Sequence, residues 1–152
     1  MAPPKPRQAK RKYFSVEEAN KALPLVRAIV GDIVRQFRSV NELSQRLTAV
    51  TQGRKLKNPD PYSEELAQSQ AEMEAEEAKL RSYYEELTAL GVELKGQDGL
   101  CDFPSIMDGH EVYLCWRLGE PEVMYWHELH TGFAGRKRLD SMATARAAET
   151  SN

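Results

Sequence analysis

The chain has 152 residues, a length that predicts a single domain. Its 21 Lys and Arg residues nearly balance its 23 Asp and Glu residues, and the formal net charge of −2 excludes a uniformly basic nucleic-acid-binding protein. A hydrophobic content of 41% with 29% charged residues is typical of a globular chain rather than a disordered or membrane-embedded one.

The N-terminal segment lacks the pattern of a folded element. Residues 1–12 contain three prolines and five basic residues, which predicts a disordered basic arm. The arm is interpreted as a solubilising segment in preference to a weak nucleic-acid contact. No apolar stretch follows it as in a signal peptide, and residues 22–34 form too short and interrupted a run to span a membrane. We therefore expect a cytoplasmic protein with no membrane contact.

The first long helix is predicted from apolar residues spaced three and four apart. Ser15 and Glu18 have the spacing of a capping box, but Pro24 is unfavourable inside a helix. We therefore expect a short helix to about residue 21 and a main helix from about residue 23. Its apolar stripe consists of Val26, Ile29, Val30, Ile33, Val34, Phe37, Val40, Leu43, Leu47 and Val50.

A second helix is predicted over residues 63–90, after a Gly- and Pro-containing turn segment at 51–62. Its apolar residues recur every seven positions, as in a coiled-coil seam: Leu66, Met73, Leu80 and Leu87. Each helix would be ~40 Å long, more than a small core can bury, so we expect an antiparallel hairpin with a projecting tip. The net charge of +4 over residues 13–57 and −6 over 63–90 favours pairing within or between chains.

After Gly91 the apolar spacing changes to two, which predicts strands. Asp108 and Gly109 form a strong hairpin signal, and residues 91–130 are expected to form a meander of about four strands. The predicted fold is therefore α+β: a long antiparallel helical hairpin, coiled-coil-like, packed on a small antiparallel β-meander. Residues 13–139 form this single domain, and residues 140–152 are expected to form a flexible tail.

Strand alternation separates a core face, which carries Trp116 and Trp126, from a polar face. We expect the polar face to collect the candidate ligand-binding residues Asp102, Cys115, Arg117, Glu120 and His127. His127 would serve as a base or ligand, Arg117 would hold an anion, and Cys115 would be a nucleophile if a cation lowered its pKa. The structural alternative pairs Arg117 with Asp102 or Glu120 and packs Cys115 as a small hydrophobic residue.

Other motifs carry no predicted site. His127 and His130 lack the spacing of a zinc-protease motif and would face opposite sides of a strand, so no metal is predicted there. Residues 132–138 contain two glycines and three basic residues but lack the pattern of a phosphate-binding loop, and we expect an exit loop. Cys101 and Cys115 are expected to be reduced thiols. The sequence identifies no cofactor.

Several motifs resemble those of a bacterial domain-of-unknown-function family, number 2203. They lie at residues 13–20, 23–24, 99–104, 114–120, 125–128 and 132–136, and the resemblance covers about residues 13–139. It implies a small cytoplasmic bacterial protein and supplies no established activity, substrate or catalytic residue. Cys101 departs from the pattern, which has an apolar residue such as Val there, so Cys115 is the more interesting thiol.

Two functions remain open at this stage. The leading hypothesis is a non-enzymatic interaction or scaffold module, because the helices are longer than the core requires and the apolar stripe of the second helix is weak near Leu66 and Met73. The hairpin would bind a protein partner or a second copy of the chain. The alternative is a small ligand- or metal-binding domain, or an enzyme, with a site around Arg117 and His127.

Overall fold

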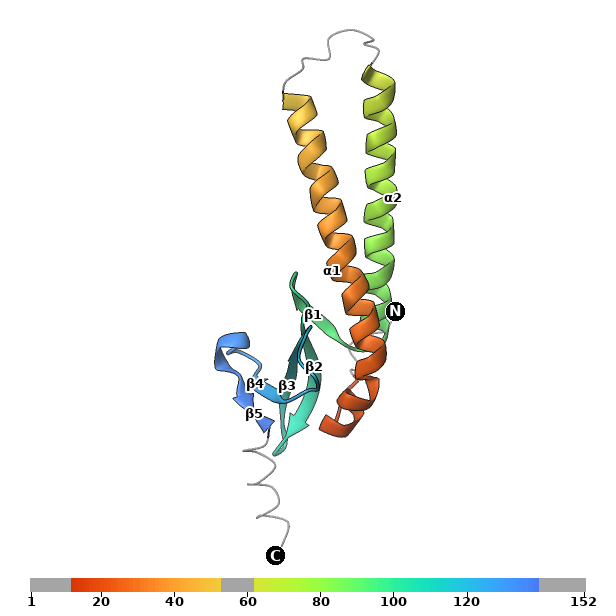
Figure 1. The fold of residues 1–152 in the computed structure, drawn as a ribbon. Helices are drawn as coiled ribbons and strands as arrows, with labels where there is room; N and C mark the ends of the chain where they lie inside the picture. The colour runs from red at the N-terminus through yellow and green to blue at the C-terminus, as the bar shows by residue number, and fades with distance from the viewer. Residues whose placement is uncertain (1–11, 53–61, 140–152) are drawn as a thin grey trace, which may run out of the picture.

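The computed structural model describes residues 12–52 and 62–139, so residues 1–11 of the predicted arm, residues 53–61 and the predicted tail lie outside the described residues. The elements in chain order are α1 (Val16–Gln52), α2 (Tyr62–Ala89), β1 (Glu93–Gly96), β2 (Leu100–Met107), β3 (His110–Arg117), β4 (Tyr125–Glu128), the 3-10 turn η1 (Phe133–Gly135) and β5 (Lys137–Arg138). Figure 1 shows a long helical hairpin with a small sheet packed beside part of its length. This is the predicted α+β arrangement.

Helix α1 is continuous over 37 residues, so the predicted break before Pro24 is wrong. The capping box forms as predicted: the backbone N–H of Glu18 donates to the Ser15 hydroxyl, and the backbone N–H of Ser15 donates to the Glu18 carboxylate, both at 3.0 Å. The proline ring is exposed, whereas Leu23 and Val26 are buried on either side of it. Packing of this buried face outweighs the hydrogen bond that Pro24 cannot make.

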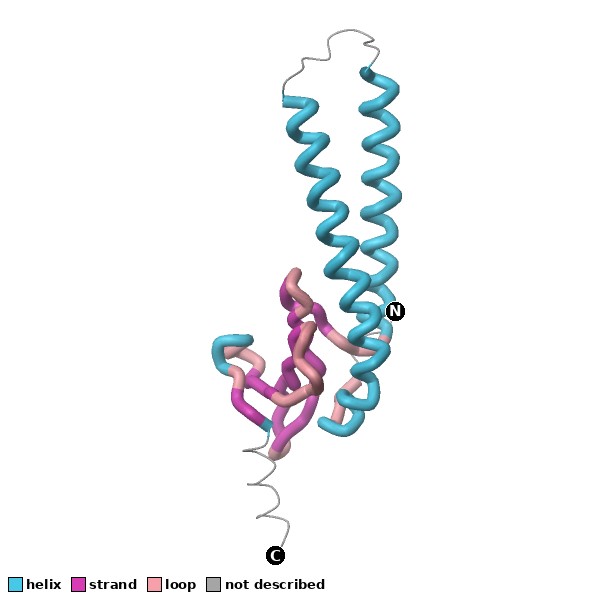
Figure 2. The backbone as a smooth tube through the Cα atoms, viewed as in Figure 1, coloured by secondary structure: helices cyan, strands magenta, loops and turns pink. Residues whose placement is uncertain are grey.

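Helix α2 returns alongside α1, and the two helices diverge toward the tip of the hairpin (Figures 1 and 2). Gln36 is the last buried residue of α1 up to residue 51, and its side-chain amide donates to the backbone carbonyl of Glu76 at 2.9 Å and also to the Glu76 carboxylate. None of residues 37–51 and 63–86 is buried. We call residues 37–52 and 63–78 the distal half of the hairpin. No helix within the described ranges has an apolar stretch that would cross a bilayer.

The sheet is an antiparallel meander of five strands in the order β1-β2-β3-β4-β5, one more strand than predicted. Asp108 and Gly109 join β2 to β3 with φ angles of 51° and 80°, as a two-residue turn of the predicted kind requires. Short β5 pairs with β4 beyond the predicted end of the meander.

One face of the sheet packs on the hairpin and forms the core, as the positions of the two tryptophans predicted. Its strand residues meet α1 and α2 in one apolar cluster that includes Val26, Val30, Ile33, Leu87, Phe103, Leu114, Trp116 and Trp126. The segment before α1 also joins the sheet, because the backbone N–H of Phe14 donates to the carbonyl of Pro104 at 2.7 Å. The Phe14 ring meets the Phe103 ring edge to face, with 5.2 Å between ring centroids.

Candidate functional site on the polar sheet face

Three buried side chains meet on the sheet face away from the helices. Asp102 comes from β2, Cys115 from β3 and His127 from β4, and one ligand atom of each lies within 4.8 Å of the others. The strand register explains their meeting: Asp102 lies directly opposite Cys115, while His127 lies opposite Tyr113, two residues from Cys115 on the same face. Their exposed fractions are only 4%, 0% and 2%. We call these three residues the buried cluster.

The imidazole of His127 is held at both nitrogens. Its Nδ1 lies 2.7 Å from the backbone carbonyl oxygen of Glu128, and because a carbonyl can only accept, Nδ1 carries a proton. Its Nε2 lies 2.9 Å from Oδ1 of Asp102, so a proton lies between this nitrogen and the carboxylate. The ring is thus oriented with Nε2 toward the other two members of the buried cluster.

The environment of Cys115 favours the protonated thiol over the thiolate. Burial raises the pKa of Cys115 to about 12, and the charge of Asp102, which also accepts a hydrogen bond from the thiol, adds to the rise. The nearby Arg136 guanidinium acts in the opposite direction but does not offset these effects. The nucleophile hypothesis required a lowered pKa, and this condition is not met. Burial likewise raises the pKa of Cys101 to about 12.

The remaining two predicted site residues lie outside the buried cluster. The Arg117 guanidinium is 3.1 Å from the carboxylate of Asp98 and covers the ring of Phe133 at 4.5 Å from its centroid. Oε1 of Glu120 accepts the backbone N–H of Arg117 at 2.8 Å. The side-chain partner of Arg117 is therefore Asp98, rather than the predicted Asp102 or Glu120. Of the five predicted site residues, three therefore form the buried cluster, while Arg117 and Glu120 make contacts outside it.

Arg136 joins this face although the sequence did not predict it. Its guanidinium is 2.6 Å from the carboxylate of Glu120 and lies 3.9 Å from the ring centroid of Tyr125. It also donates to the backbone carbonyl of Cys115 at 3.4 Å. Arg136 belongs to the segment interpreted as an exit loop, and strand alternation carries no information about a side chain that reaches the sheet from a loop.

Glu93 on β1 is a second residue that the prediction missed. Its carboxylate accepts the hydroxyl of Tyr113 at 3.1 and 3.2 Å and pairs with Lys95 at 3.0 Å. The Tyr113 ring in turn lies 5.5 Å from the ring of His127, centroid to centroid. Because Glu93 is paired with Asp102 across the strands, correct assignment of this register would have placed it on the polar face.

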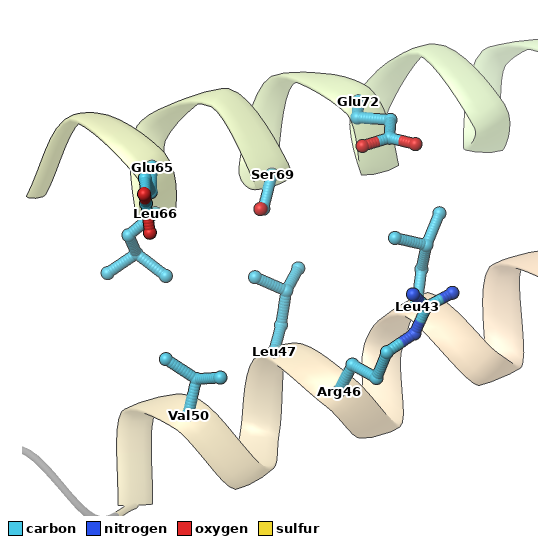
Figure 3. Close-up of a pocket in the computed structure, with 8 residues that line it drawn as sticks. All are labelled: Leu43, Arg46, Leu47, Val50, Glu65, Leu66, Ser69 and Glu72. Atoms are coloured by element: carbon cyan, nitrogen blue, oxygen red, sulfur yellow. The ribbon is translucent and has the colours of Figure 1, made fainter. Parts of the chain in front are cut away.

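A second candidate surface lies in the distal half of the hairpin. Figure 3 shows apolar side chains of α1 and α2 pointing toward one another across the space between the helices. They line a groove of about 360 Å³, together with three charged side chains and a serine: Leu43, Arg46, Leu47, Val50, Glu65, Leu66, Ser69 and Glu72. We call this the distal groove.

These features define a class of protein: an α+β domain in which a five-stranded meander packs on the base of a helical hairpin and carries a buried polar cluster on its outer face. Over residues 12–139 the chain matches the model of a family described as uncharacterized conserved protein (DUF2203), and it belongs to that family. The family suggested by the sequence motifs is thereby confirmed. Searches of curated proteins and of solved structures found no match.

Proposed function

We propose that the protein is a non-enzymatic interaction module whose hairpin binds a second copy of the chain through the distal groove. The observation that carries this proposal is the incomplete burial of the hairpin seam. None of residues 37–51 and 63–86 is buried, although the apolar stripe continues to Val50, which is 48% exposed. An apolar stripe that continues beyond the core is a common mark of an interaction surface.

Two helices alone cannot cover both sides of such a stripe. Leu43 and Leu47 of α1 and Leu66 of α2 are only half-buried in the distal half. Each Å² of apolar surface removed from water contributes about 25 cal/mol, so covering these side chains is favourable. A second hairpin placed on the distal groove would surround them with four helices, the arrangement that stabilises four-helix bundles.

The charges along the distal groove favour a second copy as the occupant. Arg46 lies on α1, whereas Glu65 and Glu72 lie on α2. A two-fold axis that places α1 of each chain against α2 of the other brings Arg46 to the glutamates of the partner chain, and it does so twice. The groove is thus complementary to itself in charge.

Helix α1 itself is less basic than the sequence range 13–57 that was used to predict charge pairing with the second helix. Helix α1 contains five basic and four acidic residues, a net charge of +1, because the other basic residues of the first half lie outside its bounds. Helix α2 has a net charge of −6, and residues 62–78 contain six Glu and no Lys or Arg. Complementarity therefore depends on Arg46 rather than on a uniformly basic first helix.

Analytical ultracentrifugation of the full chain tests this proposal. We expect a dimer at micromolar concentration, a monomer for Leu47→Glu and a dimer for the matched control Thr48→Glu, which adds the same charge at an exposed neighbouring position. Arg46→Glu should weaken the dimer, and adding Glu72→Arg to it should restore association. Circular dichroism verifies that each variant remains helical.

Two results of the same experiment would contradict the proposal. A wild-type chain that stays monomeric at its highest soluble concentration would overturn the second-copy proposal, as would a dimer that resists Leu47→Glu. The alternative of one binding or catalytic site shared by Arg117 and His127 has less support, because Arg117 pairs with Asp98 and does not join the buried cluster that contains His127.

A further inference from the structure

We propose that the buried cluster of Asp102, Cys115 and His127 is a binding site for a zinc-type divalent cation. The ligands would be a carboxylate oxygen, a thiolate sulfur and the imidazole Nε2. Zinc binds these atoms at about 2.0 to 2.3 Å in a tetrahedral arrangement, which places ligand atoms roughly 3 to 4 Å apart. The three atoms already lie within 4.8 Å of one another, so modest side-chain rotation suffices. This site lies on the sheet and does not depend on the proposed function of the hairpin.

The environment of His127 is the first argument for a metal. A metal-binding histidine usually donates its other ring N–H to a carbonyl or carboxylate, which fixes the tautomer and the ring orientation. His127 has this arrangement, because Nδ1 donates to the carbonyl of Glu128 at 2.7 Å. The nitrogen that remains to bind a metal is Nε2, which is the one that faces Asp102.

The charge balance is the second argument. A divalent cation would replace two protons, the one on the Cys115 thiol and the one between His127 Nε2 and Asp102. The charges of the thiolate and the carboxylate then offset the two positive charges of the ion, while His127 is neutral. The occupied site has no net charge, and such a centre is tolerated where side chains are 0 to 4% exposed.

The identity and support of the ligands indicate the class of ion. Calcium and magnesium prefer oxygen ligands, whereas a nitrogen, a sulfur and an oxygen together suit zinc. The ligands project from three adjacent hydrogen-bonded strands, so the backbone holds their relative positions before any ion binds. Three protein ligands leave the fourth tetrahedral position for a water molecule or a small exogenous ligand.

Cobalt titration of the chelator-treated full chain provides the test, because Co²⁺ replaces zinc and reports sulfur ligation by its absorption. We expect one Co²⁺ per chain, a thiolate-to-cobalt charge-transfer band in the near ultraviolet, and loss of this band when Zn²⁺ is added. Cys115→Ser should abolish the band. The matched control is Cys101→Ser, which alters the other buried thiol and should retain it.

Several outcomes would overturn the proposal. The wild-type result is decisive on its own: binding of no Co²⁺, or binding without the sulfur band, excludes the site. Loss of the band in Cys101→Ser with retention in Cys115→Ser would exclude it as well. Because Cys115→Ser is a buried change, the nearly isosteric Asp102→Asn gives a second test, in which at least a tenfold loss of Co²⁺ affinity is expected with the circular dichroism spectrum unchanged. Unchanged affinity in that folded variant would refute the role of Asp102.

Discussion

The turn between β1 and β2 offers a sharp test of how the sheet is fitted to the hairpin. Gly99 in this turn has a φ of +91°, a conformation that side chains disfavour. A Cβ atom at this position would lie 2.6 Å from Cβ of Leu118 and 3.1 Å from Cγ1 of Val30, which belongs to α1. Cβ of Leu118 is fixed to the backbone and cannot rotate away, so Gly99→Ala must displace the strand or the helix.

The size of this effect can be separated into two parts. The positive φ costs about 1–2 kcal/mol for a residue with a Cβ atom. The steric overlap adds about 1–3 kcal/mol, as overpacking in a dense interior usually does. The smaller entropy of the unfolded alanine chain returns about 0.4–1 kcal/mol. We therefore expect Gly99→Ala to lower the free energy of unfolding by about 2–4 kcal/mol.

Gly109 provides the matched control. Its φ is +80°, but no atom lies within 4 Å of a Cβ built there, so Gly109→Ala bears only the backbone cost of about 1 kcal/mol. Urea denaturation followed by circular dichroism measures both variants at one protein concentration, with the m-value as a check that the same surface unfolds. If Gly99→Ala is no more destabilising than Gly109→Ala, the close approach of α1, β3 and this turn is refuted.

Three further predictions concern single side chains. In the metal-free folded chain, Cys101 and Cys115 should resist a thiol reagent at pH 8 and react only after denaturation. The reason is that a pKa of about 12 leaves roughly one thiol in 10⁴ ionised at this pH. Rapid reaction of the native chain would contradict this prediction. Hydrogen bonds from the Ser15 backbone and hydroxyl hold the pKa of Glu18 below its usual value, so its stabilising effect is complete above the unfolded pKa and is lost as the pH falls through the folded pKa. Glu18→Gln should therefore lose less stability on acidification than wild type, and identical acid titrations of thermal unfolding would argue against the capping box. Arg136→Lys should lower the free energy of unfolding by about 1 kcal/mol, because an ammonium replaces a planar guanidinium that both pairs with a carboxylate and stacks on aromatic rings. An unchanged melting temperature would show that this stacking does not stabilise the fold.

Local sequence signals predicted most of the elements, and the error at Pro24 shows what such signals leave out. The rule that proline ends a helix considers only the chain around Pro24. The fold adds a contact that the rule cannot include: the side chain of Asn20, one turn earlier, accepts the backbone N–H of Val123 at 2.7 Å and donates to its carbonyl at 3.5 Å. This contact and the buried residues around it hold the first turns of α1 in place, so the helix continues through the proline.

The sequence predicted which face of the sheet carries the candidate site residues, but it did not predict which of these residues contact one another. A strand alternates with period two, and this placed Asp102, Cys115 and His127 on one side of the sheet without knowledge of the register. Which of them touch depends on strand pairing, and the structure aligns Asp102 with Cys115, while Arg117 lies two residues farther along β3, opposite Leu100. Pairing register joins residues far apart in the chain, so single-strand patterns do not contain it.

The two proposed sites can be gained or lost independently, because the core lies between them. The buried cluster is on the outer face of the sheet, whereas α1 and α2 pack on the opposite face through residues such as Trp116. The distal groove lies farther along the hairpin, past the last buried residue, Gln36. A metal ion would restrain β2, β3 and β4 relative to one another without contacting the helices. Metal removal should therefore act on the stability of the sheet, and Leu47→Glu on association alone.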